Sequence, residues 1–131
     1  GFIEFLSDLK SKNILIGLAS NAIRKNVTLT LNELGVYDLF DSIICGDEVS
    51  NGKPNPEMFN STLERFGLKK ENCLIFEDSI EGVSGAISSG ISVIGVMSSS
   101  SEDILKKAGC FKTIDDYIDL EISKIKPEIN N

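Results

Sequence analysis

The amino-acid sequence predicts an α/β fold built around a mainly parallel β-sheet with helices on both faces. Short apolar runs, typical of strands that are buried on both faces, alternate with segments of about 10–15 residues whose apolar positions recur at helical spacing. Such alternation produces right-handed strand–helix–strand units. The carboxyl ends of the strands therefore lie along one edge of the sheet, where open α/β sheets bind ligands.

The first half of the chain alternates helical stripes with apolar runs, and two of the stripes stop at a glycine, which tolerates a left-handed helix end. In order, the predicted elements are a helix over 2–11 (Phe2, Phe5, Leu6, Leu9), a strand over 13–20 (NILIGLAS), a helix over 23–34 (Ile23, Val27, Leu31, Leu34) ended by Gly35, a strand over 41–45 (DSIIC), a polar loop over 46–56, and a helix carrying Met58, Phe59, Leu63 and Phe66, ended by Gly67.

The second half repeats the alternation. The length of the whole chain, 131 residues, fits one domain. We assign residues 1–126 to a partial α/β core and residues 127–131 to a frayed tail. In order, the predicted elements are a strand over 72–76 (NCLIF), a helix marked by Ile80, Val83 and Ile87 and ended by Gly90, a strand over 92–97 (SVIGVM), a serine-capped short helix within 98–109, and a short strand or turn with a final half-helix within 110–120.

The composition excludes several classes of function. Twenty acidic side chains against 13 basic ones give a net charge of -7, which argues against binding to nucleic acid or acidic membranes. No apolar run approaches the roughly 18 residues of a membrane span. Histidine is absent, so Ser–His and Cys–His catalysis within the chain is excluded. The three cysteines are widely spaced and form no CxxC pair, which predicts free thiols and a reducing compartment, the cytoplasm; the two in apolar runs, Cys45 and Cys73, are predicted to be buried.

Two polar segments at predicted strand and helix boundaries are candidates for binding an anion. Ser20 and Asn21 come immediately after the apolar run ILIGLA, where a hydroxyl at a strand end and the free N–H groups of a helix start suit a phosphate; the alternative is that one of them only caps the helix. Lys53 lies in NGKPNPE, in which Asn55 and Pro56 fix the next helix start. A lysine on such a stiff turn could reach a phosphoryl oxygen, and the alternative is a solvated surface lysine.

Glu77 and Asp78 follow the predicted strand at 72–76 and form the third polar segment. Two adjacent carboxylates at a strand end repel each other unless a cation relieves the repulsion. Mg²⁺ accepts one or two carboxylates and keeps positions for water and phosphate, so it could also join an acidic protein to an anionic substrate. The alternative is that Asp78 or Ser79 caps the following helix while Glu77 is solvated.

Together these segments resemble motifs of the haloacid dehalogenase superfamily, in particular its β-phosphoglucomutase-like phosphatase branch. LIGLASN is similar to the second motif, FDSIICGDEVSNGKPNPEMF to the third and CLIFEDSIEGVSGAISSG to the fourth. The resemblance implies a Rossmann-like core and Mg²⁺-dependent transfer of a phosphoryl group from a small phosphorylated substrate. It implies phosphate binding by Ser20, Asn21 and Lys53, a catalytic role for Lys53, and a metal site at Asp78 assisted by Glu77.

The family's first motif, a strand ending in DxD whose first Asp becomes a phosphoaspartate, has no counterpart in the sequence. Asp47 lies in the third-motif region, and no apolar strand is evident before the acidic pair at 115–116. The family's cap domain is also absent, and the chain lacks an initiator Met. We therefore expect the carboxyl-terminal part of a larger enzyme, inactive alone.

The missing strand would lie in the sheet centre, between the strands at 14–18 and 73–76. Its loss would expose two apolar strand edges, so we expect the chain to self-associate or to close the gap. The resemblance favours a phosphatase, which needs only water as acceptor, and leaves a phosphomutase of the same family as an alternative. A noncatalytic α/β binding module is the rival from another class, and a receiver-like domain is a third.

Overall fold

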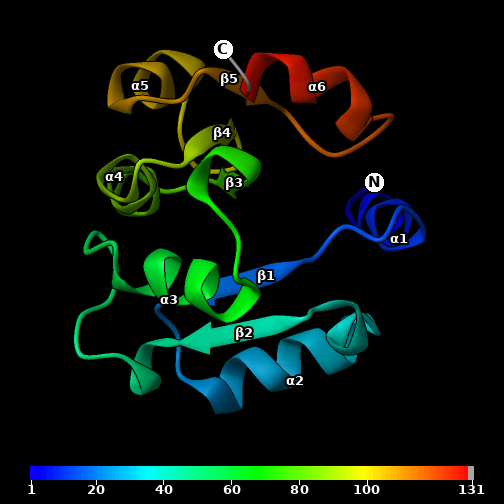
Figure 1. The fold of residues 1–131 in the computed structure, drawn as a ribbon, viewed down its shortest axis with the longest axis vertical. Helices are drawn as coiled ribbons and strands as arrows, with labels where there is room; N and C mark the ends of the chain where they lie inside the picture. Colours follow the sequence, from blue (N-terminus) through cyan, green and yellow to red (C-terminus); the bar gives the residue numbers. More distant parts are fainter. Residues whose placement is uncertain (130–131) are drawn as a thin grey trace.

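The computed structural model describes residues 1–129 and has the predicted α/β architecture (Figure 1). Within these residues, no helix is both long and apolar enough to cross a bilayer. The helices are α1 (Phe2–Ser11), α2 (Arg24–Leu34), α3 (Glu57–Phe66), α4 (Ile80–Ser89), α5 (Glu102–Ala108) and α6 (Ile122–Ile129), with short 3₁₀ turns η1 (Tyr37–Leu39), η2 (Gly46–Glu48) and η3 (Lys70–Asn72). The strands are β1 (Gly17–Ser20), β2 (Ser42–Cys45), β3 (Leu74–Glu77), β4 (Ser92–Val96) and β5 (Lys112–Ile114).

The strands form two parallel sheets instead of one. β1 pairs with β2, with Gly17 opposite Ser42, while β3, β4 and β5 form a second sheet in which Leu74 lies opposite Ser92. In the described part of the chain, β1 and β3 belong to different sheets. The predicted interruption between these two strands is therefore confirmed, and the single chain does not close it.

Both sheets nevertheless contribute to the same two apolar clusters, one on each face of the layer. Each strand can contact both clusters because its successive side chains point to opposite sides. One apolar cluster joins Leu18 of β1 and Phe76 of β3 to residues of α1 and α2. The other joins Ala19 and Ile75 of the same two strands to residues of α3, α4 and α5. Helices therefore cover both faces, as predicted, and the two sheets act as one interrupted layer.

The predicted strand at 13–20 is shorter in the structure, since β1 begins only at Gly17. Asn13 has a positive φ of 57°, which breaks the extended conformation at the start of the apolar run. The backbone N–H of Ile16 donates to the Asp41 carboxylate at 2.8 Å, and its carbonyl accepts from the Asp41 N–H at 2.7 Å. The residues before β1 thus bond to the loop before β2 and not to a sheet neighbour.

The end of the chain confirms one sequence prediction and corrects another. β5 is the short strand predicted within 110–120, and it directly precedes Asp115. The half-helix predicted within 110–120 is wrong: Asp116 accepts the Ile118 N–H at 2.8 Å in a local turn that competes with a helix, and α6 begins at Ile122. α6 extends through Ile129, residues 130–131 lie outside the described part, and the frayed tail assigned to 127–131 stays a prediction.

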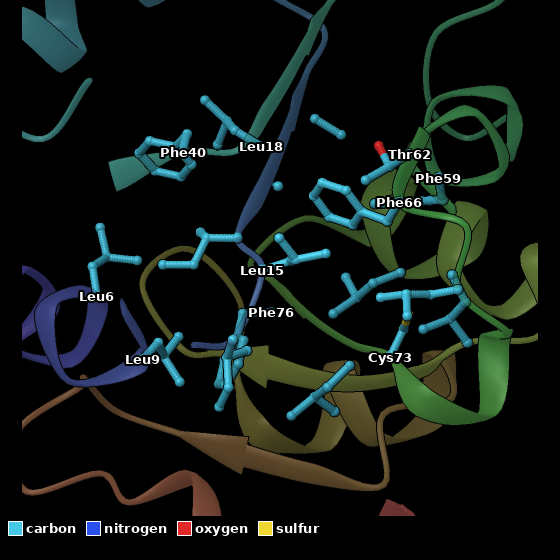
Figure 2. Close-up of a pocket in the computed structure, with 18 of the residues that line it drawn as sticks. Leu6, Leu9, Leu15, Leu18, Phe40, Phe59, Thr62, Phe66, Cys73 and Phe76 are labelled. Carbon is cyan, nitrogen blue, oxygen red and sulfur yellow. The ribbon is translucent and has the colours of Figure 1, made fainter. Parts of the chain in front are cut away.

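An apolar cavity of about 330 Å³ lies between β1 and β3 (Figure 2). Leu15 and Leu18 line it from the β1 segment, and Phe76 and Cys73 line it from the β3 segment. Residues of α1 and α3 line it as well. The interruption of the layer is therefore a space bounded by hydrocarbon and not a hydrogen-bonded seam.

Candidate active site

Lys53 and Glu77 meet at the carboxyl ends of β1 and β3. The Lys53 ammonium donates to the Ala19 carbonyl at 2.7 Å and to the Glu77 carboxylate at 2.8 Å. Both side chains are only 10% exposed, and the ring of Phe59 lies 5.4 Å from the ammonium. Lys53 is therefore not the solvated surface lysine of the alternative interpretation. Its side chain crosses the interruption and joins the two sheets at one end.

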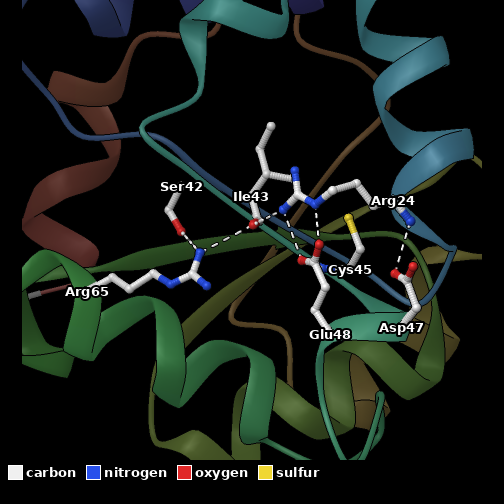
Figure 3. Close-up of polar contacts among 7 residues, drawn as sticks. All are labelled: Arg24, Ser42, Ile43, Cys45, Asp47, Glu48 and Arg65. Carbon is white, nitrogen blue, oxygen red and sulfur yellow. Dashed lines mark hydrogen bonds and ion pairs between the residues drawn. The ribbon is translucent and has the colours of Figure 1, made fainter.

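The loop that carries Lys53 begins at an anchored 3₁₀ turn (Figure 3). The Arg24 guanidinium donates to the Glu48 carboxylate, through Nη2 at 2.9 Å and also through Nε, and this hydrogen bond lowers the pKa of Glu48. Glu48 also accepts the Cys45 N–H at 3.0 Å. Asp47 accepts the Arg24 N–H at 3.0 Å, so this aspartate caps the start of α2.

The same loop is fixed at its other end. Glu57, at the start of α3, accepts the N–H groups of Ser50 and Asn51 at 3.0 and 3.1 Å. The Asn55 side chain accepts the Glu57 N–H at 2.9 Å, although α3 begins one residue later than predicted, with Pro56 and not Asn55 in the N-cap position. Lys53 thus lies in a loop held by side-chain hydrogen bonds on both sides.

Ser20 is the last residue of β1 and Asn21 follows it, but neither caps α2, which begins at Arg24 after Ile23. The Ser20 hydroxyl accepts the Ala22 N–H at 3.2 Å. The Asn21 side chain accepts the Lys53 N–H at 2.8 Å and donates to the Lys53 carbonyl at 3.2 Å. Asn21 therefore contacts the main chain of Lys53, a connection that the sequence spacing did not reveal.

Glu77 and Asp78 have different surroundings despite being adjacent. Glu77 pairs with Lys53, accepts the Ser79 hydroxyl at 3.3 Å and lies over Gly82, where an added Cβ would come within 1.9 Å of the Glu77 carboxyl carbon. Asp78 is exposed and accepts the Ser98 hydroxyl at 3.2 Å. Ser79 caps α4 through the Gly82 N–H, as the alternative interpretation expected of that residue.

Asp78 is thus the more available of the two carboxylates for an external cation. Within residues 1–129, no group of three or more acidic or cysteine side chains lies close enough to hold a metal ion. A Mg²⁺ ion needs only one or two carboxylates if water and phosphate supply the other ligands. Asp78 fits such a partial shell, whereas the Lys53 ammonium already neutralises Glu77.

Tyr117 is a neighbour of this acidic pair that sequence analysis missed. Burial, followed by the charges of Asp78 and Glu77, raises the pKa of Tyr117 to about 12. Its ring packs near those of Phe5 and Phe76, with centroids 5.5 and 5.6 Å away. The sequence offered no signal for this position, because Tyr117 comes from a turn after β5 and only the fold brings it to β3.

The cysteines are free thiols, as predicted. Cys45 is buried as predicted and Cys110 is buried too, whereas the predicted burial of Cys73 is wrong, since this residue is half-buried beside the cavity. Burial raises the pKa of all three thiols, which lowers the thiolate fraction needed for nucleophilic chemistry. The polar residues at the strand ends are therefore the better candidates for function.

Fold and site together define a Rossmann-like α/β protein with a lysine whose side chain is largely covered, a hydroxyl and carboxylates at the carboxyl ends of parallel strands. The chain belongs to the haloacid dehalogenase-like hydrolases, whose family model matches residues 1–96. The family predicted from the three motifs is confirmed.

Two curated relatives and one crystal structure illustrate the similarity. The chain is 39% identical over 100 residues to a phosphorylated carbohydrates phosphatase of Thermotoga maritima, covering 76% of the chain and 46% of that protein. It is 35% identical over 125 residues to a glyceraldehyde 3-phosphate phosphatase of Methanothermobacter thermautotrophicus, covering 92% and 54%. The crystal structure of a β-phosphoglucomutase from Clostridium difficile gives a TM-score of 0.85 at 32% identity, covering 99% and 55%. The chain thus spans about half the length of these relatives.

Proposed function

We propose that the chain supplies the phosphate- and metal-binding half of a Mg²⁺-dependent phosphatase that acts on a small phosphorylated metabolite. The observation that carries the proposal is the desolvated Lys53 ammonium, held between Ala19 and Glu77 where two parallel strands end. An ammonium group has three donors, and these two contacts leave one for a phosphoryl oxygen. The names of the relatives, two phosphatases and a mutase of sugar phosphates, support the same substrate class.

The proposed roles follow from the chemistry of each group. Lys53 neutralises charge that develops on the phosphoryl group, an interaction strengthened by its low exposure. The Ser20 hydroxyl and the backbone N–H of Asn21 hold phosphoryl oxygens. The nucleophilic carboxylate, which would form a phosphoaspartate, comes from a segment outside these 131 residues.

Asp78 is the proposed ligand of Mg²⁺, and Glu77 assists by holding the Lys53 ammonium at the end of β3. When bound, Mg²⁺ supplies positive charge that offsets the phosphate oxygens and the acidic protein. Asp78 is exposed at the strand end and carries one neutral partner, Ser98, which leaves carboxylate lone pairs available.

A phosphomutase is the second candidate, favoured by the likeness to β-phosphoglucomutase. It differs from a phosphatase in the acceptor of the phosphoryl group, water or a second sugar hydroxyl. A noncatalytic binding module is the alternative from another class. Product analysis with sugar phosphates separates the first two, and the absence of any turnover favours the third.

The experiment uses the protein encoded by the full reading frame that contains these residues. Asp78→Asn and Lys53→Met are each expected to lower Mg²⁺-dependent phosphate release by about a hundredfold or more, because each removes charge stabilisation from the reaction. Asp103→Asn, an exposed carboxylate of α5 paired with Lys107, is the matched control and should keep the activity. Full Mg²⁺-dependent activity in Asp78→Asn would remove Asp78 from the mechanism.

We also propose that chain 1–131 on its own self-associates through the edges of β1 and β3. The apolar cavity between these edges supports this proposal, since exposed strand edges favour pairing with another chain. Sedimentation velocity over a range of concentrations should detect a dimer. A single monomeric species at every concentration would contradict it.

A further inference from the structure

We infer that Asn21 is a positioning residue whose side chain sets the main chain of Lys53 and does not bind the phosphate. The inference rests on the proposed role of Lys53 and deepens it. It separates two adjacent residues that the sequence placed in one phosphate site: Ser20 keeps its hydroxyl for a ligand, whereas the Asn21 amide is engaged within the protein.

The amide of Asn21 makes paired hydrogen bonds with a single residue 32 positions away. Its Oδ1 accepts the Lys53 N–H at 2.8 Å, and its Nδ2 donates to the Lys53 carbonyl at 3.2 Å. Only this orientation of the amide places a donor against an acceptor at both contacts. Two bonds to one peptide segment fix its direction as well as its position, which one bond would not do.

Two glycines let the loop approach Asn21 this closely. A Cβ added at Gly46 would lie 2.0 Å from the Asn21 carbonyl oxygen, and one added at Gly52 would lie 2.6 Å from Oδ1 of the Asn21 side chain. Heavy atoms do not approach this closely in packed proteins, so any larger residue would push the loop away. The loop therefore closes around Asn21 at both of its ends.

The contacts of Asn21 also determine where the lysine head group lies. The Lys53 ammonium binds the Ala19 carbonyl, and Ala19 is only two residues from Asn21 on the same strand end. The main chain and the ammonium of Lys53 are thus both hydrogen-bonded to residues at the carboxyl end of β1. A lysine side chain that is held both at its main chain and at its ammonium loses less conformational freedom when the ammonium binds a phosphoryl group.

The test compares Asn21→Ala with Asn26→Ala, an exposed asparagine on α2, in the full protein. The first measurement is hydrogen exchange of the Lys53 amide. Loss of its acceptor in Asn21→Ala should speed the exchange about fivefold to tenfold. Asn26→Ala should leave the exchange rate unchanged. An unchanged rate in Asn21→Ala would overturn the inference.

The second measurement is the turnover of the double variant with Lys53→Met. If Asn21 acts only through Lys53, adding Asn21→Ala to Lys53→Met causes no further loss of kcat, whereas additive losses would overturn the inference. Gly52→Ala, which displaces the loop and keeps Asn21, should match the loss of Asn21→Ala, and full activity of Gly52→Ala would also overturn it. Full activity of Lys53→Met alone would reject the proposed function, and amide exchange would still decide the role of Asn21.

Discussion

The outer edge of β2 and the inner edges of β1 and β3 have different surroundings. On the outer edge, the Ile43 carbonyl accepts from Arg24 at 2.7 Å and from Arg65 at 3.3 Å, while the Cys45 N–H donates to Glu48 (Figure 3). On the inner side, the edges face an apolar cavity of about 330 Å³ (Figure 2). Lys53 binds one inner carbonyl, that of Ala19.

The difference shows two ways of ending a sheet. Charged side chains from α2, α3 and η2 satisfy the β2 backbone and stop it from pairing with another chain, which is a known protection of edge strands. The inner edges are lined by apolar side chains, and these stabilise the fold only when their surface is removed from water. The chain thus covers the outer edge, whose four strand residues are buried, and leaves an apolar space at the edges beside its polar site.

The largest expected effect compares two isoleucines on neighbouring strands. Ile94 of β4 is fully buried, whereas Ile75 of β3 is half-buried and lines the cavity. Ile94→Ala should lower the free energy of unfolding by about 2–5 kcal/mol through a new void. Ile75→Ala should lower it by about 1–2 kcal/mol, because its side chain already adjoins empty space. Urea unfolding measures both values.

The exposed Ile104 of α5 supplies the control for this comparison. Ile104→Ala should change the free energy of unfolding by less than either of the other variants. Equal losses for Ile94→Ala and Ile75→Ala would mean that the inner edge is as well packed as the sheet interior.

The next effect tests the protection of the outer edge. Arg24→Met leaves Glu48 without its cation and removes a donor from the Ile43 carbonyl. We expect a loss of about 1 kcal/mol in the free energy of unfolding and a higher tendency to associate. Urea unfolding and sedimentation measure the two effects. Lys25→Met on the same helix is the control, and an equal effect there would show that the edge contacts are unimportant.

The smallest effect concerns the amino end of the β1–β2 pair and depends on pH. The Lys10 ammonium, at 2.6 Å, and the Ile16 N–H hold the pKa of Asp41 below its usual 3.8. The folded state thus favours the charged carboxylate, so this contribution is present above the unfolded pKa and is lost as pH falls through the folded one. Unfolding midpoints measured from about pH 5 down to about pH 2 should fall less in Asp41→Asn than in the unaltered protein.

The control for this pH effect is Asp8→Asn, whose ion pair with Lys12 is more exposed than the pair of Asp41 with Lys10. Asp8→Asn should alter the pH dependence less, because solvent screens its pair more strongly. If Asp41→Asn showed the same pH dependence as the unaltered protein, ionisation of Asp41 would not contribute to the stability of the fold.

Many features of the fold could be predicted because they depend on residues near one another in sequence. The helices end at Gly35, Gly67 and Gly90 as predicted, since each glycine adopts a left-handed conformation there. The motif spacing gave the family and the interruption between the strands. The shortened first strand and the displaced final helix could not be predicted, because Asp41 and Asp116 bond to backbone groups that periodicity ignores.

The sequence by itself determined the alternation of elements and which polar residues follow the strands. The tertiary structure decided how those residues are used: Asn21 holds the Lys53 main chain, Asp47 caps α2, and Lys53 pairs with Glu77 across two sheets. The physical reason is the separation along the chain between the groups that interact. Helix and strand patterns arise from contacts between neighbours in the chain, whereas hydrogen bonds between groups 23 to 32 residues apart form only after packing has fixed their distances and directions.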